Sequence, residues 1–231
     1  MRKVLLLCSI LAFGTTASAQ SSLDPAWSLG LSSAFSTNQH QVGAYMDQYK
    51  IRSNRNSPNL LRFGVYAQAK FPGLSIRPEL TYSTTKFIMH VQNLSLGQED
   101  WKAFAAEEYY RKLELYLPVG LNIRDNMTLE IGPVAGRRIF QAASDTQIRR
   151  ISGNSPPESE LLHDLSGSFH AWTFDWRAGV QFSGGPFRFG VAYQSNITPV
   201  GSYISHNGHR YQMRQQYSQL IVNAGLQLFR W

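Results

Sequence analysis

Apolar and polar residues alternate with a period of two along eight stretches of the chain. In residues 113–136, LELYLPVGLNIRDNMTLEIGPVAG, apolar side chains occupy almost every second position on both sides of the polar turn Arg124-Asp125-Asn126. This alternation predicts strands with one apolar and one polar face, and the short turn predicts a β-hairpin. The eight predicted strands cover residues 27–35, 63–71, 74–82, 113–123, 127–135, 172–182, 187–193 and 220–228.

Short and long connections between these strands alternate. Strands two and three, four and five, and six and seven are separated by two to four residues. The other four connections are long and polar, so all of them fall at one end of the sheet. Outer-membrane barrels have this asymmetry, with short periplasmic turns and long extracellular loops. We therefore predict an all-β fold, an eight-stranded antiparallel up-and-down transmembrane β-barrel. Its long extracellular loops are residues 37–59, 84–107, 139–168 and 196–215.

The polar face of the predicted strands carries charged side chains of both signs. An eight-stranded barrel has an interior just wide enough for side chains to fill it. Because a lone buried charge is costly, we expect these charges to be paired in a network that plugs the lumen and excludes a wide pore. The predicted lumenal charge network comprises Arg62, Lys70, Arg77, Glu79, Glu114, Glu130, Asp175, Arg177 and Arg188.

Three prolines, Pro78, Pro118 and Pro133, lie inside predicted strands. A closed barrel has no free edge, so each proline removes a hydrogen bond from the ladder. We expect a β-bulge at each of them.

The first residues of the chain have the pattern of a secretory signal. The positive pair Arg2-Lys3 precedes an apolar segment, residues 4–13, and an A-x-A cleavage site ends at Ala19. We expect a signal peptide over residues 1–19, cleaved near Ala19, and a mature outer-membrane barrel domain over residues 20–231.

Composition narrows the class of protein further. The single cysteine of the 231 residues is Cys8, inside the predicted signal, so the mature chain would form no disulfide and no cysteine-ligated metal site. Loss of Arg2 and Lys3 lowers the formal net charge from +7 to +5. Beyond the signal, no apolar run approaches the roughly 18 residues of a transmembrane helix. These features leave a soluble secreted protein or a membrane β-barrel, in which only alternate residues meet lipid.

Four segments carry a family resemblance: GLSIRPELTYS (73–83), LELYLPVGLNI (113–123), LEIGPVAG (129–136) and FRFGVAYQSNIT (187–198). They resemble the PorT-like small outer-membrane β-barrels, which show a strand with a proline before Glu-Leu, an LE-x-PVGL-like strand and a following strand with a Gly-Pro step. The resemblance covers most of residues 26–231. It implies the outer membrane of a Gram-negative bacterium and no single activity.

The last strand resembles the terminal strands that the barrel-assembly machinery reads in many outer-membrane proteins. Phe229 and Trp231 supply the terminal aromatic residues, but the apolar residues from Leu220 to Leu228 alternate in the opposite phase. This mismatch requires either a local irregularity near Leu228 or a weaker assembly signal than the terminal aromatic residues suggest.

Two pairs of residues are candidates for chemistry. Glu114 and Glu130 lie on neighbouring predicted strands, and paired carboxylates can act as acid and base. The alternative, which we favour, is that both are structural lumenal charges. His206 and His209 could bind a metal, but no Cys, Asp or Glu lies nearby in the sequence to complete the site, so a solvated pair is favoured.

The segment Tyr193-Gln194-Ser195-Asn196 resembles the His-x-Ser-Asn motif of eight-stranded outer-membrane lipid A deacylases, in which the histidine activates the serine. Here Tyr193 occupies the histidine position, and a tyrosine is a poor base at neutral pH. His170 on the adjacent strand is the substitute base in this weaker, enzymatic hypothesis for Ser195.

The predicted loops carry basic residues, which could contact lipopolysaccharide phosphates or anionic glycans. The alternative is a solvated loop surface of mixed charge, because acidic residues share the same loops. Aromatic residues at strand ends suit lipid-interface girdles. The basic loop residues are Arg137, Arg138, Arg149, Arg150, Arg210 and Arg214, and the girdle residues are Trp27, Tyr82, Trp172, Tyr193 and Tyr217.

The sequence thus favours a non-enzymatic, monomeric outer-membrane barrel with a plugged polar interior, no cofactor and no metal. Its surface loops would serve interaction or envelope-structural roles. The expected partners are outer-membrane lipid and lipopolysaccharide, the barrel-assembly machinery, and a surface protein or glycan, but no nucleic acid. The alternatives are a lipid-acting hydrolase that uses Ser195 and a secreted soluble barrel that binds a small apolar ligand.

Overall fold

The computed structural model describes residues 25–46, 49–53, 56–93, 104–139, 146–149, 161, 164, 168 and 170–231. The predicted signal peptide lies outside these residues. Within the described ranges, no helix combines the length and the apolar character needed to cross a membrane.

Antiparallel β-strands make up nearly all of the described chain. Their bounds are β1 (Ala26–Met46), β2 (Tyr49–Ser53), β3 (Asn56–Lys70), β4 (Leu74–Ile76), β5 (Glu79–Asn93), β6 (Phe104–Tyr116), β7 (Val119–Arg124), β8 (Met127–Arg138), β9 (Thr146–Arg149), β10 (Trp172–Gly184), β11 (Phe187–Asn196), β12 (Tyr203–His206) and β13 (His209–Arg230).

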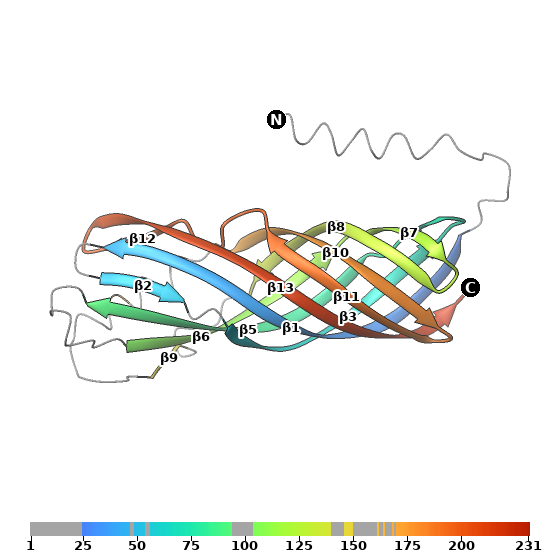
Figure 1. Cartoon of the computed structure of the whole chain (residues 1–231), viewed down its shortest axis with the longest axis horizontal. Coiled ribbons are helices and arrows are strands. Elements are labelled where there is room, and N and C mark those ends of the chain that lie inside the picture. Colours follow the sequence, from blue (N-terminus) through green and yellow to red (C-terminus); the bar gives the residue numbers. More distant parts are fainter. Residues whose placement is uncertain are drawn as a thin grey trace, which may run out of the picture.

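Eight strand paths close into a barrel (Figure 1). β4 and β5 are two halves of one barrel strand, and β6 and β7 are two halves of the next. Around the barrel the order is β1, β3, β4/β5, β6/β7, β8, β10, β11 and β13, and β13 pairs with β1 to close it. At the seam, the Trp27 amide donates to the Trp231 carbonyl at 3.0 Å. The predicted eight-stranded antiparallel up-and-down barrel is therefore confirmed.

Prolines interrupt the barrel strands differently from the prediction. Pro78 and Pro118 divide β4 from β5 and β6 from β7, whereas β8 runs through Pro133 with no shift in its register against β10. The expected bulges at these three prolines are therefore wrong. Proline removes a donor but keeps its carbonyl, and the Arg77 amide donates to the Pro118 carbonyl at 3.3 Å. A short break thus preserves the register that a bulge would shift.

The irregularity expected near Leu228 is present. The register of β1 against β13 shifts between Leu29, which pairs with Phe229, and Gly30, which pairs with Gln227. Leu228 is the extra residue of this bulge. Because a bulge resets the alternation of side chains, Leu228 and Phe229 are both exposed.

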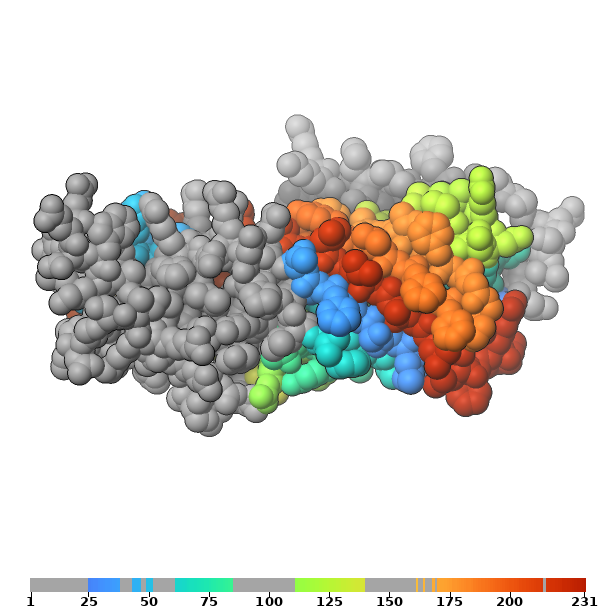
Figure 2. All heavy atoms as spheres, turned by 60° about the horizontal axis from the view of Figure 1, so that its bottom comes forward, coloured from blue at the N-terminus to red at the C-terminus, as the bar shows by residue number. Residues whose placement is uncertain are grey.

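The outer face of the barrel is an apolar belt. Neighbouring strands β1, β13, β11 and β10 lie side by side on the face shown in Figure 2. Soluble proteins rarely expose contiguous apolar patches larger than a few hundred Å², whereas barrel surfaces that face lipid are apolar. The belt therefore identifies a transmembrane barrel. Every barrel strand contributes exposed large hydrophobic side chains, among them Leu31, Phe63, Leu80, Leu115, Ile131, Phe174, Phe189 and Val222.

Several strands continue beyond the barrel and form a second region, which we call the extension. It consists of the distal parts of β1, β5, β6 and β13 together with β2, β9 and β12, and it lies at the left in Figure 1. The described residues of three segments predicted as loops, 37–59, 84–107 and 196–215, are therefore largely strand. Strands that are already paired at the rim satisfy further backbone groups by extending the same ladder. Much of the fourth segment, 139–168, lies outside the described residues.

The extension encloses an apolar core. Ile51 of β2, Ile204 of β12 and Met213 of β13 are at most 2% exposed. The barrel interior is polar, so the character of the interior reverses where the strands leave the barrel. The extension core comprises Ala44, Met46, Tyr49, Ile51, Leu161, Val200, Ile204, Met213 and Tyr217, with Tyr211 packed against it.

Tyr217 does not belong to the aromatic girdle, so its predicted position is wrong. Its side chain is 5% exposed and points inward at the boundary between the extension core and the lumen. Leu220 and Val222 face outward on the same strand, and the alternation of side chains therefore turns Tyr217 inward. The other girdle residues are exposed: Trp27, Tyr82, Trp172 and Tyr193.

Candidate functional site

One part of the lumen is organised around the Arg77 guanidinium. It donates two hydrogen bonds to the Glu130 carboxylate, from Nε to Oε1 at 3.0 Å and from Nη2 to Oε2 at 2.8 Å. Glu79 lies 3.5 Å from the same guanidinium and accepts from the Ser32 hydroxyl at 2.6 Å. All four side chains are buried. A bidentate pair of this kind fixes the orientation of both groups.

A second part is organised around Glu114, which is completely buried. Its carboxylate lies 2.5 Å from Lys112 Nζ, 2.6 Å from Arg62 Nη2 and 3.7 Å from Arg177 Nη2. Taking a carboxylate out of water is tolerated only when other groups compensate its charge. Three cations supply that compensation here.

The Gln194 carboxamide connects this group to the extension. Its Oε1 accepts two hydrogen bonds from Arg177, at 2.8 and 3.0 Å, and its Nε2 donates to Asp175 at 2.7 Å. The Tyr217 hydroxyl donates to Asp175 and accepts from Lys112 Nζ, the latter at 3.0 Å. Tyr217 thus belongs both to the polar network and to the extension core.

Two buried tyrosines fill the remaining space between the cations. The Arg177 guanidinium lies 4.3 Å from the centre of the Tyr116 ring, and that of Arg188 lies 4.8 Å from the centre of the Tyr66 ring. Each barrel strand contributes to the interior, as expected when an eight-stranded barrel is filled by side chains. The contributing residues, strand by strand, are Ser32, Arg62, Glu79, Glu114, Glu130, Asp175, Gln194 and Tyr217.

Among the predicted lumenal charges, Lys70 and Arg188 lie at the short-turn end of the barrel, and Arg188 meets the network through the Tyr66 ring, whose centre is also 5.5 Å from the Arg77 guanidinium. Lys70 Nζ donates to the Asp125 carbonyl at 2.9 Å, and Arg188 donates to the Ser28 hydroxyl at 3.3 Å. They help to line a cavity of about 220 Å³ at that end.

Sequence reasoning missed several members of the network. Lys112 lies between the predicted loop 84–107 and the predicted strand 113–123, although it is two residues before Glu114 and therefore on the same face. Tyr66, Tyr116 and Gln194 occupy inward positions of their strands too. Extending the alternation two residues before Glu114 would have identified Lys112, and extending it to uncharged inward residues would have identified the other three.

The proposed carboxylate pair does not come together. Glu114 contacts Arg62 and Lys112, whereas Glu130 contacts Arg77. Each carboxylate is held by its own cations. Neither geometry provides the paired acid and base that the catalytic hypothesis requires.

Ser195 and His170 do not come together either. The Ser195 hydroxyl donates to the Tyr217 carbonyl at 3.5 Å, whereas His170 Nε2 lies 2.7 Å from the Ser202 hydroxyl. A serine nucleophile needs a base that a third group orients. In the part of the chain that the structure describes, no carboxylate contacts His170. Among the described residues, the hydrolase hypothesis therefore has no base that could activate Ser195.

The two histidines of the last predicted loop have different surroundings. His206 Nδ1 lies 2.8 Å from the Asp164 carboxylate and its ring packs edge-on against Tyr49, while His209 is exposed beside Tyr211. Across the described ranges, no group of three or more His, Cys, Asp or Glu side chains is placed to hold a metal ion.

The basic residues predicted for the loops do not form one cluster: some lie at the barrel rim and others in the extension. Arg137 lies at the barrel rim, where its guanidinium is 5.6 Å from the Trp172 ring, and Arg138 follows it. Arg210 is exposed near the tip of the β12–β13 hairpin. Of the remaining residues, Arg149 and Arg214 are described as strand backbone and Arg150 lies outside the described residues.

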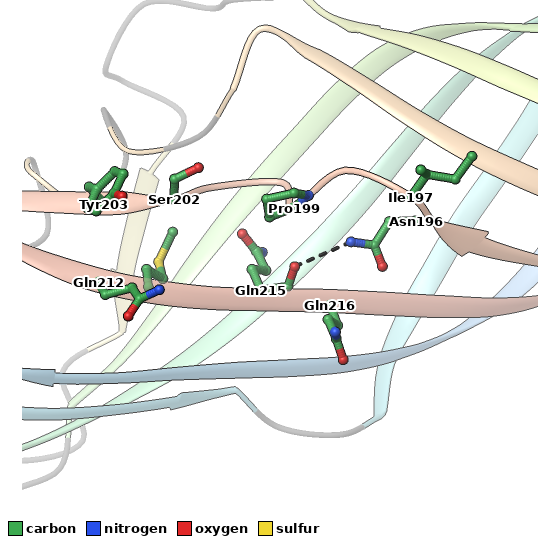
Figure 3. A pocket seen from close by; sticks show the side chains of 9 residues that line it. Asn196, Ile197, Pro199, Ser202, Tyr203, Gln212, Gln215 and Gln216 are labelled. Carbon is green, nitrogen blue, oxygen red and sulfur yellow. Dashed lines mark hydrogen bonds between the residues drawn. The ribbon is translucent and has the colours of Figure 1, made fainter. Parts of the chain in front are cut away.

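A pocket of about 400 Å³ lies where β13 leaves the barrel (Figure 3). Its walls come from β13 and from the segment between β11 and β12. Figure 3 shows Gln215 projecting from β13 toward the segment that carries Pro199 and Ser202. The lining residues are Asn196, Ile197, Pro199, Ser202, Tyr203, Gln212, Met213, Gln215 and Gln216.

No protein-family model matches the chain, and no curated protein matches it at a significant level. Solved structures of outer-membrane proteins are similar to it over most of their length. The attachment invasion locus protein Ail of Yersinia pestis is 12% identical, with 89% of this chain and 100% of that chain covered and a TM-score of 0.39. OprG of Pseudomonas aeruginosa is 10% identical, with 90% and 97% covered and a TM-score of 0.43. The protease OmpT of Escherichia coli is 9% identical, with 93% and 100% covered and a TM-score of 0.43. Likenesses this distant say nothing about activity.

The chain's own geometry defines its class. A closed barrel of eight strands, an interior filled by paired charges and an apolar outer belt make up the architecture of an integral outer-membrane β-barrel. A soluble barrel that binds an apolar ligand would need the opposite arrangement, with the apolar face inside. The structure excludes that arrangement in the barrel.

Proposed function

We propose that this protein is a non-enzymatic envelope barrel of the Gram-negative outer membrane, monomeric, and a member of the PorT-like group that four of its segments resemble. The observation that carries the proposal is the lumenal network around Arg77 and Glu114, which fills the barrel from every strand. A filled lumen cannot conduct solutes, so function resides at the ends. A cleaved signal peptide over residues 1–19 belongs to the same proposal.

The extension is the part of the molecule best suited to interaction. It has its own apolar core, so it presents a folded surface rather than four separate loops. We place the short turns in the periplasm and the extension outside the cell. Lipid and lipopolysaccharide surround the belt, the terminal strand engages the assembly machinery, and a surface protein or glycan binds the extension.

A basic residue at the barrel rim supports the binding of anionic lipopolysaccharide groups there. Arg137 is exposed there and lies over Trp172, an arrangement in which a guanidinium remains available to phosphate. Arg210 lies near the tip of the β12–β13 hairpin, so it would not contact the same anionic group as Arg137.

The proposal is tested on protein extracted from the outer-membrane fraction. Electrophoretic mobility should differ between boiled and unboiled samples, because a folded barrel stays compact in cold detergent. The same protein in a planar bilayer should give no steady ion conductance. Recovery as a soluble periplasmic protein without a mobility shift would overturn the membrane location, and stepwise conductance would overturn the plug.

A further inference from the structure

The Gln215 side chain has unmet hydrogen-bonding capacity in the wall of the pocket at the barrel exit. It is completely buried, and among the residues that the structure describes neither its amide nitrogen nor its amide oxygen has a hydrogen-bond partner. Buried polar groups in native proteins are nearly always hydrogen-bonded, so an unpartnered carboxamide beside a cavity calls for an occupant. The occupant must accept a hydrogen bond from Nε2 and donate one to Oε1.

The neighbouring polar groups restrict the chemistry of that occupant. Asn196 is committed to the protein, since its Nδ2 donates to the carbonyls of Thr198 at 3.0 Å and Gln215 at 3.4 Å, and its Oδ1 accepts from the Tyr217 amide at 3.0 Å. Asn196 therefore forms part of the pocket wall, and Gln215 is the residue left to hydrogen-bond with the occupant. The Ser202 hydroxyl is oriented by His170 at 2.7 Å.

No charged side chain is among the described residues that line the pocket. An ionic ligand placed against Gln215 would lose its hydration without a counter-charge, which is costly. A hydroxyl group, in contrast, both donates and accepts, so it can satisfy both atoms of a carboxamide at no charge cost. Gln212, Gln216 and the exposed ring of Tyr203 lie at the outer part of the same pocket.

We propose that this pocket binds an uncharged saccharide unit. A volume of about 400 Å³ falls within the range of small-molecule sites, and an aromatic ring with several amides offers one stacking surface and several hydrogen bonds to sugar hydroxyls. The inference deepens the proposed function, because it names the chemistry of the glycan that the extension would bind. The saccharide comes from an outer-leaflet glycolipid or from free oligosaccharide, and both sources present the same hydroxyls.

The test uses the full mature chain in lipid nanodiscs, with the side-chain amide resonances of Gln215 as the probe. Glucose, N-acetylglucosamine and maltose are titrated separately, and glucose 6-phosphate serves as the charged comparison. At least one neutral sugar should shift the Gln215 amide resonances and should bind at least tenfold more tightly than glucose 6-phosphate. No shift with any neutral sugar, or tighter binding of glucose 6-phosphate, would overturn the proposal.

Two matched variants separate binding from packing. Gln215→Met keeps the length of the side chain and removes its hydrogen bonds, so affinity for the neutral sugar, followed by calorimetry, should fall at least tenfold. Gln219→Met removes a buried glutamine two inward positions further along β13. Within the described ranges, the amide oxygen of Gln219 also has no partner, and Gln219 is not among the residues that line the pocket. This variant should leave affinity unchanged. Equal losses in the two variants would contradict the site.

The source of the sugar and the proposed function are tested separately. If nanodiscs that contain lipopolysaccharide produce a Gln215 shift without added sugar, and nanodiscs without lipopolysaccharide do not, the ligand is a membrane glycolipid. A shift that requires free sugar indicates a soluble glycan. A barrel that is heat-modifiable and non-conducting but binds no sugar would disprove this inference and leave the proposed function standing.

Discussion

The barrel and the extension share strands but have opposite interiors. Along β13, outward positions change from Gln212 and Gln216 in the extension to Leu220 and Val222 in the barrel. Inward positions change from Met213 in the extension core to the polar lumen of the barrel. The surrounding medium explains the reversal: lipid accepts an apolar outer face, whereas water favours an apolar core. The reversal on β13 therefore marks the level at which the chain leaves the membrane.

Tyr217 lies at this boundary and shows how the two regions are joined. Its ring packs in the extension core while its hydroxyl bonds to Asp175 and Lys112 of the lumenal network. One amphipathic side chain thus meets the requirements of both interiors.

The largest effect should follow from breaking the barrel interior at Glu114. Glu114→Gln leaves Arg62, Lys112 and Arg177 without their shared carboxylate, and removal of one partner of a buried ion pair costs about 3–5 kcal/mol. Urea unfolding from lipid vesicles measures the loss. Asp125→Asn, in an exposed turn, is the control and should stay within about 0.5 kcal/mol of wild type. An unchanged unfolding midpoint for Glu114→Gln would contradict the role of the network.

The next effect should appear when the extension core loses a large side chain. Ile204 is fully buried, and Ile204→Ala should weaken the extension by about 2–5 kcal/mol through lost contacts and a cavity. Hydrogen exchange should accelerate in β12 and in the distal part of β13 and remain slow in the barrel. The same truncation at the exposed Ile131, on the outer face of the barrel, leaves no cavity and should not change exchange in β12. Uniform acceleration would mean that the two regions unfold together.

A charge on the barrel belt should cost somewhat less. Leu115 faces outward on β6, and Leu115→Arg should destabilise the folded state by about 2–4 kcal/mol if the position lies near the bilayer midplane. Ile123→Arg, beside the short turn and therefore nearer the interface, should cost only about 0–1 kcal/mol. Folding titrations in vesicles compare the two. Equal costs would mean that the belt does not cross a bilayer between these positions.

The smallest effect should come from an outward aromatic residue of the extension. Tyr45 is 67% exposed, and Lys50 Nζ lies 5.0 Å from the centre of its ring. Tyr45→Ser should cost less than about 1 kcal/mol, because water surrounds the side chain and an exposed cation–π contact is weak. Phe63→Ser, at a similarly exposed position of the barrel belt, should cost more because it places a hydroxyl against lipid. Urea unfolding in vesicles compares these variants, and the reverse order would contradict the assigned media.

The barrel could be predicted from sequence because lipid demands strict alternation. Leu113, Leu115 and Leu117 repeat at every second position, and the three short turns order the strands. Even the irregularity at Leu228 followed from a mismatch of phase. The bulges at the prolines were wrongly predicted. A break in a strand and a β-bulge both accommodate the loss of one backbone N–H donor, and only the register against both neighbouring strands distinguishes them.

The extension was harder to predict because its pattern is short and broken. Ala44 and Met46 on β1 and Tyr49 and Ile51 on β2 occupy alternate positions of two paired strands, yet polar neighbours made the segment resemble a loop. The pocket could not be predicted at all, since Gln215 is an ordinary polar residue until the segment around Ser202 packs over it. Such sites depend on contacts between distant residues rather than on spacing along the chain.

The boundary between lipid and water is tested most directly by labelling single cysteines on intact cells with a membrane-impermeant maleimide, because the single native cysteine, Cys8, lies in the predicted signal. Tyr203→Cys in the extension should label on intact cells. Asp125→Cys in a short turn should label only after the outer membrane is permeabilised, and Leu115→Cys only after denaturation. Labelling of Leu115→Cys in the native protein, or of Asp125→Cys but not Tyr203→Cys on intact cells, would contradict the assigned belt and its orientation.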